Sequence, residues 1–178
     1  MYFRPDQTKG LECFVDADFA GGWNQGESDN PASLYSRTGY VIMYHGCPII
    51  WVSKLQTEIT LSTTEAEYVA LSQAMRDVIP LMNILQDVGK SLDVPMSKPT
   101  VQCSVFEDNN GAIELVIAPK MRPRTKHIAR KYHHFREHVR KGLIKIYPID
   151  TTEQVADMFT KALSFQPLSY LRYKIQGW

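Results

Sequence analysis

The chain has 178 residues, of which 44% are hydrophobic and 22% are charged. This length and composition suit one globular domain with a full hydrophobic core and are short for two domains. No apolar run reaches the ~18 residues of a membrane span, and the N-terminus lacks the apolar segment of a secretory signal. The three cysteines, Cys13, Cys47 and Cys103, are far apart. They show no metal-binding spacing, and Cys13 and Cys103 fall in apolar strands, which favours buried thiols in a reducing compartment.

The net charge of +1 conceals a strongly basic segment at residues 120–141. This segment holds nine lysines and arginines against the single acid Glu137, and it also holds four of the five histidines. A basic block of this kind is often a solvated helix face. Its density and the interleaved Tyr132 and Phe135 favour contact of part of it with a polyanion.

The first half of the chain predicts three consecutive strands. Residues 1–10 form a lead-in, and the alternating residues 11–19 form a strand. Residues 21–37, rich in Gly, Asn, Ser and Asp, predict a long loop. Residues 39–44 and 48–52 predict two strands around a hairpin turn at residues 45–47. Consecutive strands with short links form an antiparallel meander.

A long helix is predicted over residues 63–88. Ser62 as N-cap and Glu65 three residues later form a capping box, and Gly89 is a suitable stop. Pro80 removes a backbone hydrogen bond inside the helix, so we expect a kink or a break there. Glu67 lies on the apolar face, where a carboxylate requires a partner such as a metal ion unless it sits partly exposed at the rim.

The second half continues with an apolar strand at residues 101–106, parallel to the first strand, and a helix at 109–117. A helix at 126–141 ends at Gly142, and a fifth strand covers residues 143–147. Thr151 and Gln154 form a second capping box that starts a helix containing Asp157. Apolar spacing at residues 167–178 predicts a last helix, although this aromatic tail could instead be a docking surface.

The predicted order of elements is β-β-β-α-β-α-α-β-α, which is typical of an α/β domain with a five-stranded mixed sheet flanked by helices. We expect a lead-in at residues 1–10, the domain proper at 11–163 and a helical tail at 164–178 that packs on or extends the domain.

Four carboxylates take comparable positions near strand ends and helix starts: Asp16, Glu67, Asp108 and Asp157. If the first and fourth strands are parallel neighbours, these groups converge at the crevice where open α/β sheets bind ligands. Converging acids repel one another unless cations bind, and Mg²⁺ suits carboxylate and phosphate oxygens. Helix capping alone also accounts for Asp108 and Asp157, so spacing leaves both interpretations open.

Nine motifs in fixed order carry a resemblance to a known family. They lie at residues 14–21, 36–41, 51–56, 61–68, 107–113, 124–128, 132–133, 142–144 and 154–161. Together they resemble the ribonuclease H domain of copia-type LTR retrotransposon polyproteins.

The resemblance implies a ribonuclease H-like fold and an endonuclease that hydrolyses the RNA strand of RNA–DNA hybrids with two Mg²⁺ ions, for which Mn²⁺ can substitute. It implies products with 5′-phosphate and 3′-hydroxyl ends, with Asp16, Glu67, Asp108 and Asp157 as catalytic and metal-binding residues. We prefer Asp16 to Asp18, which stands at the loop, and Glu67 to Glu65, which has a capping role.

Substrate contacts also follow from the resemblance. Ser62, with Thr63 beside it, matches a phosphate-binding position for the DNA strand, and Asn110 resembles a minor-groove contact. Arg124, Lys126 and His127 are expected to hold phosphates, which makes affinity sensitive to salt. Cellular ribonucleases H often carry a histidine in a loop before the fourth carboxylate, and residues 148–153 contain none. His127 or His133 could substitute in space, or either could be a packing or surface histidine.

The implied partners are an RNA–DNA hybrid and a reverse transcriptase domain of the same polyprotein, with no membrane. The implied location is intracellular, in a cytoplasmic virus-like particle or the nucleus. One alternative is a catalytically silent ribonuclease H-like module that binds nucleic acid or a protein partner. Another is a different nuclease or strand-transfer enzyme on the same fold, because fold does not determine function.

Overall fold

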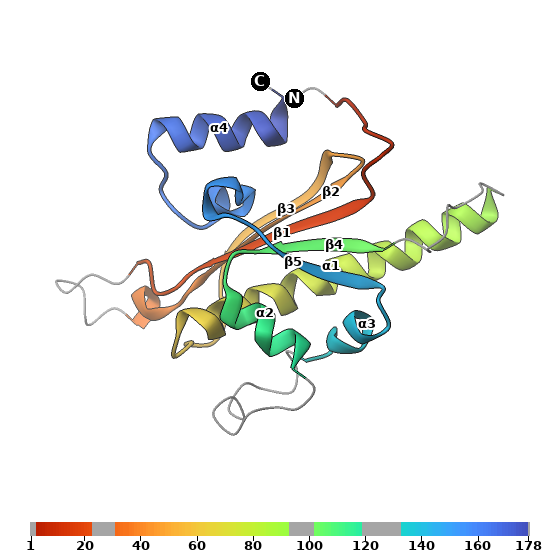
Figure 1. Cartoon of the computed structure of the whole chain (residues 1–178). Helices are drawn as coiled ribbons and strands as arrows, with labels where there is room; N and C mark the ends of the chain where they lie inside the picture. The colour runs from red at the N-terminus through yellow and green to blue at the C-terminus, as the bar shows by residue number, and fades with distance from the viewer. Residues whose placement is uncertain (1–2, 23–30, 93–101, 119–132, 178) are drawn as a thin grey trace.

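A computed structural model describes residues 3–22, 31–92, 102–118 and 133–177, and its core is one five-stranded sheet (Figure 1). The strands are β1 (Leu11–Asp18), β2 (Arg37–Tyr44), β3 (Cys47–Leu55), β4 (Cys103–Glu107) and β5 (Ile144–Pro148). Their order across the sheet is β3-β2-β1-β4-β5. Strands β1, β2 and β3 pair antiparallel, and β4 lies parallel to both β1 and β5, so the predicted mixed sheet is confirmed.

Helices cover both faces of the sheet. On one face lie α1 (Thr63–Ser91), α2 (Asn110–Ile117) and α3 (Arg136–Arg140), and on the other lies α4 (Phe165–Gln176). The larger core lies between the sheet and α1, where Val15, Tyr40, Tyr68 and Met75 are buried. Burying such side chains stabilises a fold by about 1.5–3 kcal/mol each.

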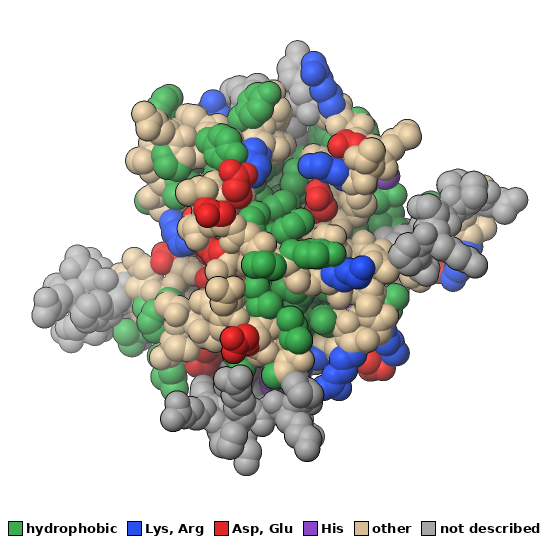
Figure 2. All heavy atoms as spheres, viewed as in Figure 1, with side chains coloured by type: hydrophobic (Ala, Val, Ile, Leu, Met, Phe, Trp, Pro, Cys, Tyr) green, Lys and Arg blue, Asp and Glu red, His purple; other side chains and the backbone are tan. Residues whose placement is uncertain are grey.

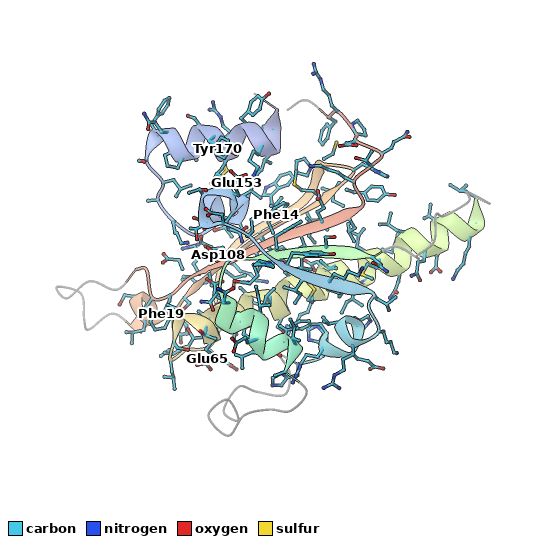
Figure 3. The ribbon with its side chains drawn as sticks, viewed as in Figure 1. Phe14, Phe19, Glu65, Asp108, Glu153 and Tyr170 are labelled. Atoms are coloured by element: carbon cyan, nitrogen blue, oxygen red, sulfur yellow. The ribbon has the colours of Figure 1, made fainter. Side chains whose placement is uncertain are left out.

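A smaller core lies between the opposite face of the sheet and α4. Phe14 and Val41 from the sheet meet Leu171 and Ile175 of α4, which confirms the helix expected in the tail. Two short 3₁₀ helices, Thr151–Glu153 and Val155–Phe159, precede α4. The Tyr170 hydroxyl donates to Glu153 Oε1 at 2.7 Å, and Lys174 Nζ contacts Glu153 Oε2 at 2.5 Å. Figure 3 shows Tyr170 directed toward Glu153.

The hairpin between β2 and β3 turns on two residues, His45 and Gly46, which have positive φ values of 51° and 74°. Two positive φ values match the twist of the flanking strands, and this conformation suits glycine at the second position. Cys47, predicted to lie in the turn, begins β3. All three cysteines are free and buried, as expected for Cys13 and Cys103.

The predicted break at Pro80 and the predicted stop at Gly89 are wrong for α1. The helix runs without a break through Pro80 and ends at Ser91, so Gly89 is a buried residue inside it. Packing explains the difference, because Met82, beyond Pro80, is buried in the larger core and Leu85 packs against the same core. These contacts outweigh the hydrogen bond that proline removes.

Two other helix predictions also fail. Within the described part of residues 126–141 the helix covers only Arg136–Arg140, and residues 133–135 are not helical. Gly142 follows it with a positive φ of 71°, as expected of a helix stop. The helix expected from Thr151 is instead the pair of 3₁₀ helices, and Asp150 caps the first of them by accepting from Thr152 N. Gln154 is wholly buried, and its side chain amide donates to Val15 O and Phe106 O. This bond to the sheet fixes the local backbone more strongly than helix propensity does.

Among the described residues, none of the helices combines the length and the apolar character needed to cross a membrane.

Candidate active site

The carboxyl ends of β1 and β4 lie side by side and meet the start of α1. Figure 2 shows acidic side chains on this side of the molecule, at the left of the view. Asp16 is near the end of β1 and wholly buried. Its register partner in β2 is Gly39, and one of its oxygens accepts a hydrogen bond from the Thr160 hydroxyl. The strand therefore holds the Asp16 carboxylate in a fixed orientation.

The capping box positions Glu67. Ser62 Oγ accepts from Glu65 N at 3.2 Å, and Glu65 Oε2 accepts in return from Leu61 N at 2.9 Å. These bonds fix the first turn of α1, so Glu67 in the next turn faces the ends of β1 and β4. Glu67 is buried, and within the described part of the chain its Oε2 atom has no hydrogen-bond partner. An orphaned buried carboxylate oxygen is costly unless a cation or a proton satisfies it.

Asp108 lies between β4 and α2 and projects toward the same side, where Figure 3 labels it. The Thr151 hydroxyl donates to Asp108 Oδ2 at 2.8 Å. The next residue, Asn109, caps α2 by accepting from Ala112 N at 3.0 Å. One carboxylate oxygen each of Asp16, Glu67 and Asp108 lies within 4.8 Å of the other two. This spacing suits three oxygens around one hard divalent cation.

The electrostatics of the group also favour a cation. Burial raises the pKa of the Glu67 carboxyl strongly, and the negative charges of Glu107, Asp16 and Asp108 raise it further. A divalent ion among these oxygens would reverse the effect and hold all of them ionised. The donor set and the orphaned Glu67 oxygen therefore fit the Mg²⁺ that the sequence predicts.

Glu107 is an acidic residue at the site that the sequence analysis did not consider. Its side chain is wholly buried at the end of β4, and it accepts from Asn109 N at 3.0 Å. Burial raises the pKa of Glu107 well above its usual range. The sequence did contain a signal for this burial. Residues 103, 105 and 107 alternate along the strand and point to the same face, and Cys103 and Val105 face the core.

Asp157 is held differently from the other three predicted carboxylates. It lies in the 3₁₀ helix Val155–Phe159 and is outside the group of three within 4.8 Å. Lys161 Nζ joins it to Asp16, at 2.9 Å from Asp157 Oδ1 and 3.1 Å from Asp16 Oδ1. Burial raises the pKa of Asp157 to about 6, even though Lys161 opposes the shift. The sequence analysis missed Lys161, although its spacing four residues after Asp157 was visible.

These side chains line an open cleft of about 460 Å³. Its described lining residues are Asp16, Ala17, Asp18, Phe19, Thr63, Glu67, Asp108, Asn109, Thr151 and Lys161. They mix acidic groups with hydroxyl and amide groups, so the cleft offers ligands for cations and hydrogen bonds for a polar substrate.

Comparison with solved structures identifies the fold. The N-terminal RNase H domain of rv2228c from Mycobacterium tuberculosis superposes with a TM-score of 0.54 at 13% identity, covering 85% of this chain and 90% of that one. LC11-RNase H1, solved in complex with an RNA/DNA hybrid, gives a TM-score of 0.51 at 17% identity over 84% of this chain and 93% of its own. The fold is that of ribonuclease H.

The sequence relatives are transposon proteins. The retrovirus-related Pol polyprotein of transposon RE2 from Arabidopsis thaliana is 32% identical over 92% of this chain. That of transposon TNT 1-94 from Nicotiana tabacum is 38% identical over 86% of this chain. The chain matches the ribonuclease H domain of a retrotransposon Pol polyprotein. It spans about 10% of the length of each of these two relatives, and no family model matches it.

The predicted substrate contacts of this ribonuclease H domain are only partly described. Ser62 and Thr63 are exposed at the start of α1, and Asn110 is exposed at the start of α2. Arg124, Lys126 and His127 lie outside the described residues. His133 Nδ1 hydrogen-bonds the Tyr68 hydroxyl at 2.5 Å, and His133 is not among the described residues that line the cleft.

One residue of the basic segment has a structural role. Arg136 is buried, and its guanidinium donates to Val116 O at 3.2 Å and to Ala118 O. These carbonyls end α2 and have no partners within that helix, so Arg136 caps it. The positive charge of Arg136 is therefore directed at backbone oxygens.

Proposed function

We propose that this domain is an endonuclease that hydrolyses the RNA strand of RNA–DNA hybrids by two-metal-ion catalysis. The observation that carries the proposal is the convergence of Asp16, Glu67 and Asp108 from three separate elements within 4.8 Å, with a buried Glu67 oxygen that has no hydrogen-bond partner among the described residues. The ribonuclease H fold and the Pol polyprotein relatives support the same activity.

The carboxylates define where the ions would bind. Asp16, Glu67 and Asp108 would hold one Mg²⁺, and Asp16 and Asp157 would share a second, with Mn²⁺ as a substitute for either. Such a pair of ions activates a water and stabilises the leaving oxygen of a phosphodiester. In the protein, Thr160 and Thr151 orient Asp16 and Asp108 through hydroxyl hydrogen bonds. Cleavage in this manner would leave 5′-phosphate and 3′-hydroxyl ends.

The exposed start of α1 would bind the DNA strand. Ser62 Oγ accepts from Glu65 N, which leaves the hydroxyl proton free to donate to a phosphate. Thr63 stands beside it in the cleft, and a helix N-terminus favours anions. Asn110 would reach the minor groove, where 2′-hydroxyls distinguish the RNA strand. Arg124, Lys126 and His127 would hold phosphates further along the hybrid.

The domain would act as one part of a longer polyprotein, next to a reverse transcriptase domain, because its relatives are Pol polyproteins about ten times its length. Its place of action would be intracellular, in a cytoplasmic virus-like particle or the nucleus.

The decisive experiment incubates the domain with a labelled RNA–DNA hybrid and Mg²⁺, beside Asp108→Asn. Single-stranded RNA, duplex RNA and duplex DNA serve as controls. We expect metal-dependent cleavage of the RNA confined to the hybrid, with a loss of at least ~100-fold in Asp108→Asn, the scale of a lost transition-state interaction. Hybrid binding without cleavage in Mg²⁺ or Mn²⁺ would favour a catalytically silent module. Fusing a polymerase domain to the same chain would then show whether the domain is inactive in itself or only lacks that partner.

A further inference from the structure

Lys161 fills the space between two carboxylates that the two-ion arrangement assigns to a metal. Its Nζ atom is 3.1 Å from Asp16 Oδ1 and 2.9 Å from Asp157 Oδ1. The Asp16 and Asp157 side chains are only 1% and 8% exposed, and among the described residues the Lys161 ammonium is the cation that pairs with both. Two carboxylates buried this closely need such a partner.

A divalent ion cannot share this position with the ammonium. Mg²⁺ coordinates oxygens at about 2.0–2.1 Å, so an ion held by the same two oxygens would lie against Nζ and be repelled by its charge. The three-carboxylate group differs, because the described ion pairs of Lys161 are with Asp16 and Asp157 and include neither Glu67 nor Asp108. Among its described ion pairs, Lys161 therefore meets the three-carboxylate group through Asp16 alone, whereas its ammonium bridges the Asp16–Asp157 position.

Lys161 has the freedom to leave. Its side chain is 35% exposed, and it lines the cleft together with Thr63, Asp108 and Thr151. A lysine side chain has four flexible carbon–carbon links, and its ammonium is strongly hydrated in water. Rotation into the cleft would move the charge away from Asp157 without any change of backbone.

We propose that Lys161 is a built-in competitor for the second divalent ion, occupying the Asp16–Asp157 position in the metal-free domain and swinging into the cleft when that ion binds. The inference rests on the proposed function only for the existence of a second ion. The first ion would then bind the group of Asp16, Glu67 and Asp108. The second ion would bind between Asp16 and Asp157 and would have to displace Lys161 from both carboxylates. The second site then needs a higher metal concentration for half occupancy than the carboxylates alone would require.

The test is calorimetric titration of Mg²⁺, in the absence of nucleic acid, into the metal-free wild type, Lys161→Gln and Lys54→Gln. Lys54 is an exposed lysine of β3 and serves as the matched control. We expect two ions to bind the wild type, and the dissociation constant of the second to fall about tenfold in Lys161→Gln, the effect of losing one opposing ion pair. Lys54→Gln should resemble the wild type.

Thermal unfolding of the same proteins provides a second readout. Lys161→Gln should unfold at a lower temperature than the wild type in EDTA, where Asp16 and Asp157 lose their cation. In saturating Mg²⁺ the two should unfold at the same temperature, because the lysine is no longer between the carboxylates.

Two results would overturn the inference while hybrid cleavage by the wild type stands. One is a second-ion affinity of Lys161→Gln within about twofold of the wild type. The other is a wild type that binds a single ion while the variant binds two, because the lysine would then exclude the ion permanently. Absence of any Mg²⁺ binding to either protein would overturn both the inference and the metal site of the proposed function.

Discussion

Burial is the main cause of the raised pKa of the Glu107 carboxyl, and the hydrogen bond that this carboxyl accepts does not prevent the shift. Asn109 N donates to Oε1, while Oε2 has no hydrogen-bond partner among the described residues. A folded pKa well above the usual range of a carboxyl favours its protonated form. Burial therefore favours the neutral form of Glu107 beside the metal-binding group, whereas an ionised Glu107 would raise the pKa of Glu67.

Replacing Glu107 by glutamine tests this state. Glutamine has the shape of the protonated acid and retains the oxygen that accepts from Asn109 N. We expect Glu107→Gln to change the free energy of unfolding by less than about 0.5 kcal/mol at neutral pH in EDTA. Glu107→Ala should cost about 2–3 kcal/mol, because it leaves a cavity and an unpaired backbone N–H. Urea denaturation of both variants measures the difference. Equal losses in the two, or abolished Mg²⁺ binding in Glu107→Gln, would show that an ionised Glu107 is needed.

At the scale of elements, the 3₁₀ helix Val155–Phe159 is pressed against β2 at Gly39. A Cβ atom at Gly39 would lie 2.6 Å from Thr160 Cγ2, 2.9 Å from Phe159 Cβ and 3.1 Å from Ala156 O. Gly39 is also the register partner of Asp16. The absence of a side chain at this one position thus allows the segment that carries Asp157, Thr160 and Lys161 to reach the sheet.

Gly39→Ala should push this segment away from Asp16. Overpacking of this kind costs about 1–3 kcal/mol, and we expect that loss in urea denaturation. Hybrid cleavage should fall more than stability alone explains, because Thr160 loses its contact with Asp16 and Asp157 moves away from the other carboxylates. Gly10→Ala is the matched control, since its nearest new contact is Gln102 O at 3.9 Å. If Gly39→Ala is destabilised but cleaves the hybrid at the wild-type rate, the position of the segment that carries Asp157, Thr160 and Lys161 does not matter for catalysis.

Arg136 links the basic segment to the fold. We expect Arg136→Gln to lower the free energy of unfolding by about 2 kcal/mol, because the charged donor to two carbonyls of α2 is lost. The slope of hybrid affinity against salt should stay unchanged, since this guanidinium faces Val116 O and Ala118 O. Lys126→Gln should instead make the slope of log affinity against log salt concentration shallower by about one, the contribution of a single phosphate contact. Fluorescence anisotropy at several salt concentrations compares them, and a reduced slope in Arg136→Gln would assign this arginine to the nucleic acid.

These elements show which features the sequence could predict. Local signals succeeded where bonds are local, as in the box of Ser62 and Glu65 that starts α1. They failed where a residue far away in the sequence determines the backbone conformation. Gln154 is an example, since its side chain amide donates to Val15 O, 139 positions earlier. Asp16, Glu67 and Asp108 could be grouped from strand ends and motif spacing. The ion pair of Lys161 with Asp16 could not, because it depends on how a 3₁₀ helix is placed against the sheet.

At the scale of the whole molecule, the acidic site makes the metal-free domain less stable as pH rises. Glu67, Glu107 and Asp157 all have pKa values raised above their unfolded values, chiefly by burial. Groups of this kind stabilise the fold fully below their unfolded pKa, and their contribution is lost as pH rises through the folded pKa. Four exposed carboxyls act in the opposite sense at more acidic pH, because hydrogen bonds lower the pKa of Asp6, Glu137, Asp150 and Glu153.

We therefore expect the melting temperature in EDTA to be highest near about pH 5 and to fall toward about pH 8, because the raised carboxyls must ionise in a buried site without a divalent ion. Saturating Mg²⁺ should raise the melting temperature more at the higher pH, where the ligands are already deprotonated and the ion binds more tightly. Asp157→Asn should make the decline below about pH 6 shallower, since the pKa of Asp157 is raised to about 6. Differential scanning calorimetry across this range, with and without Mg²⁺, measures all three effects. A melting temperature that rises steadily with pH in EDTA would contradict this expectation. It would mean that further cations of the protein, besides Lys161, neutralise the buried carboxylates in the metal-free domain.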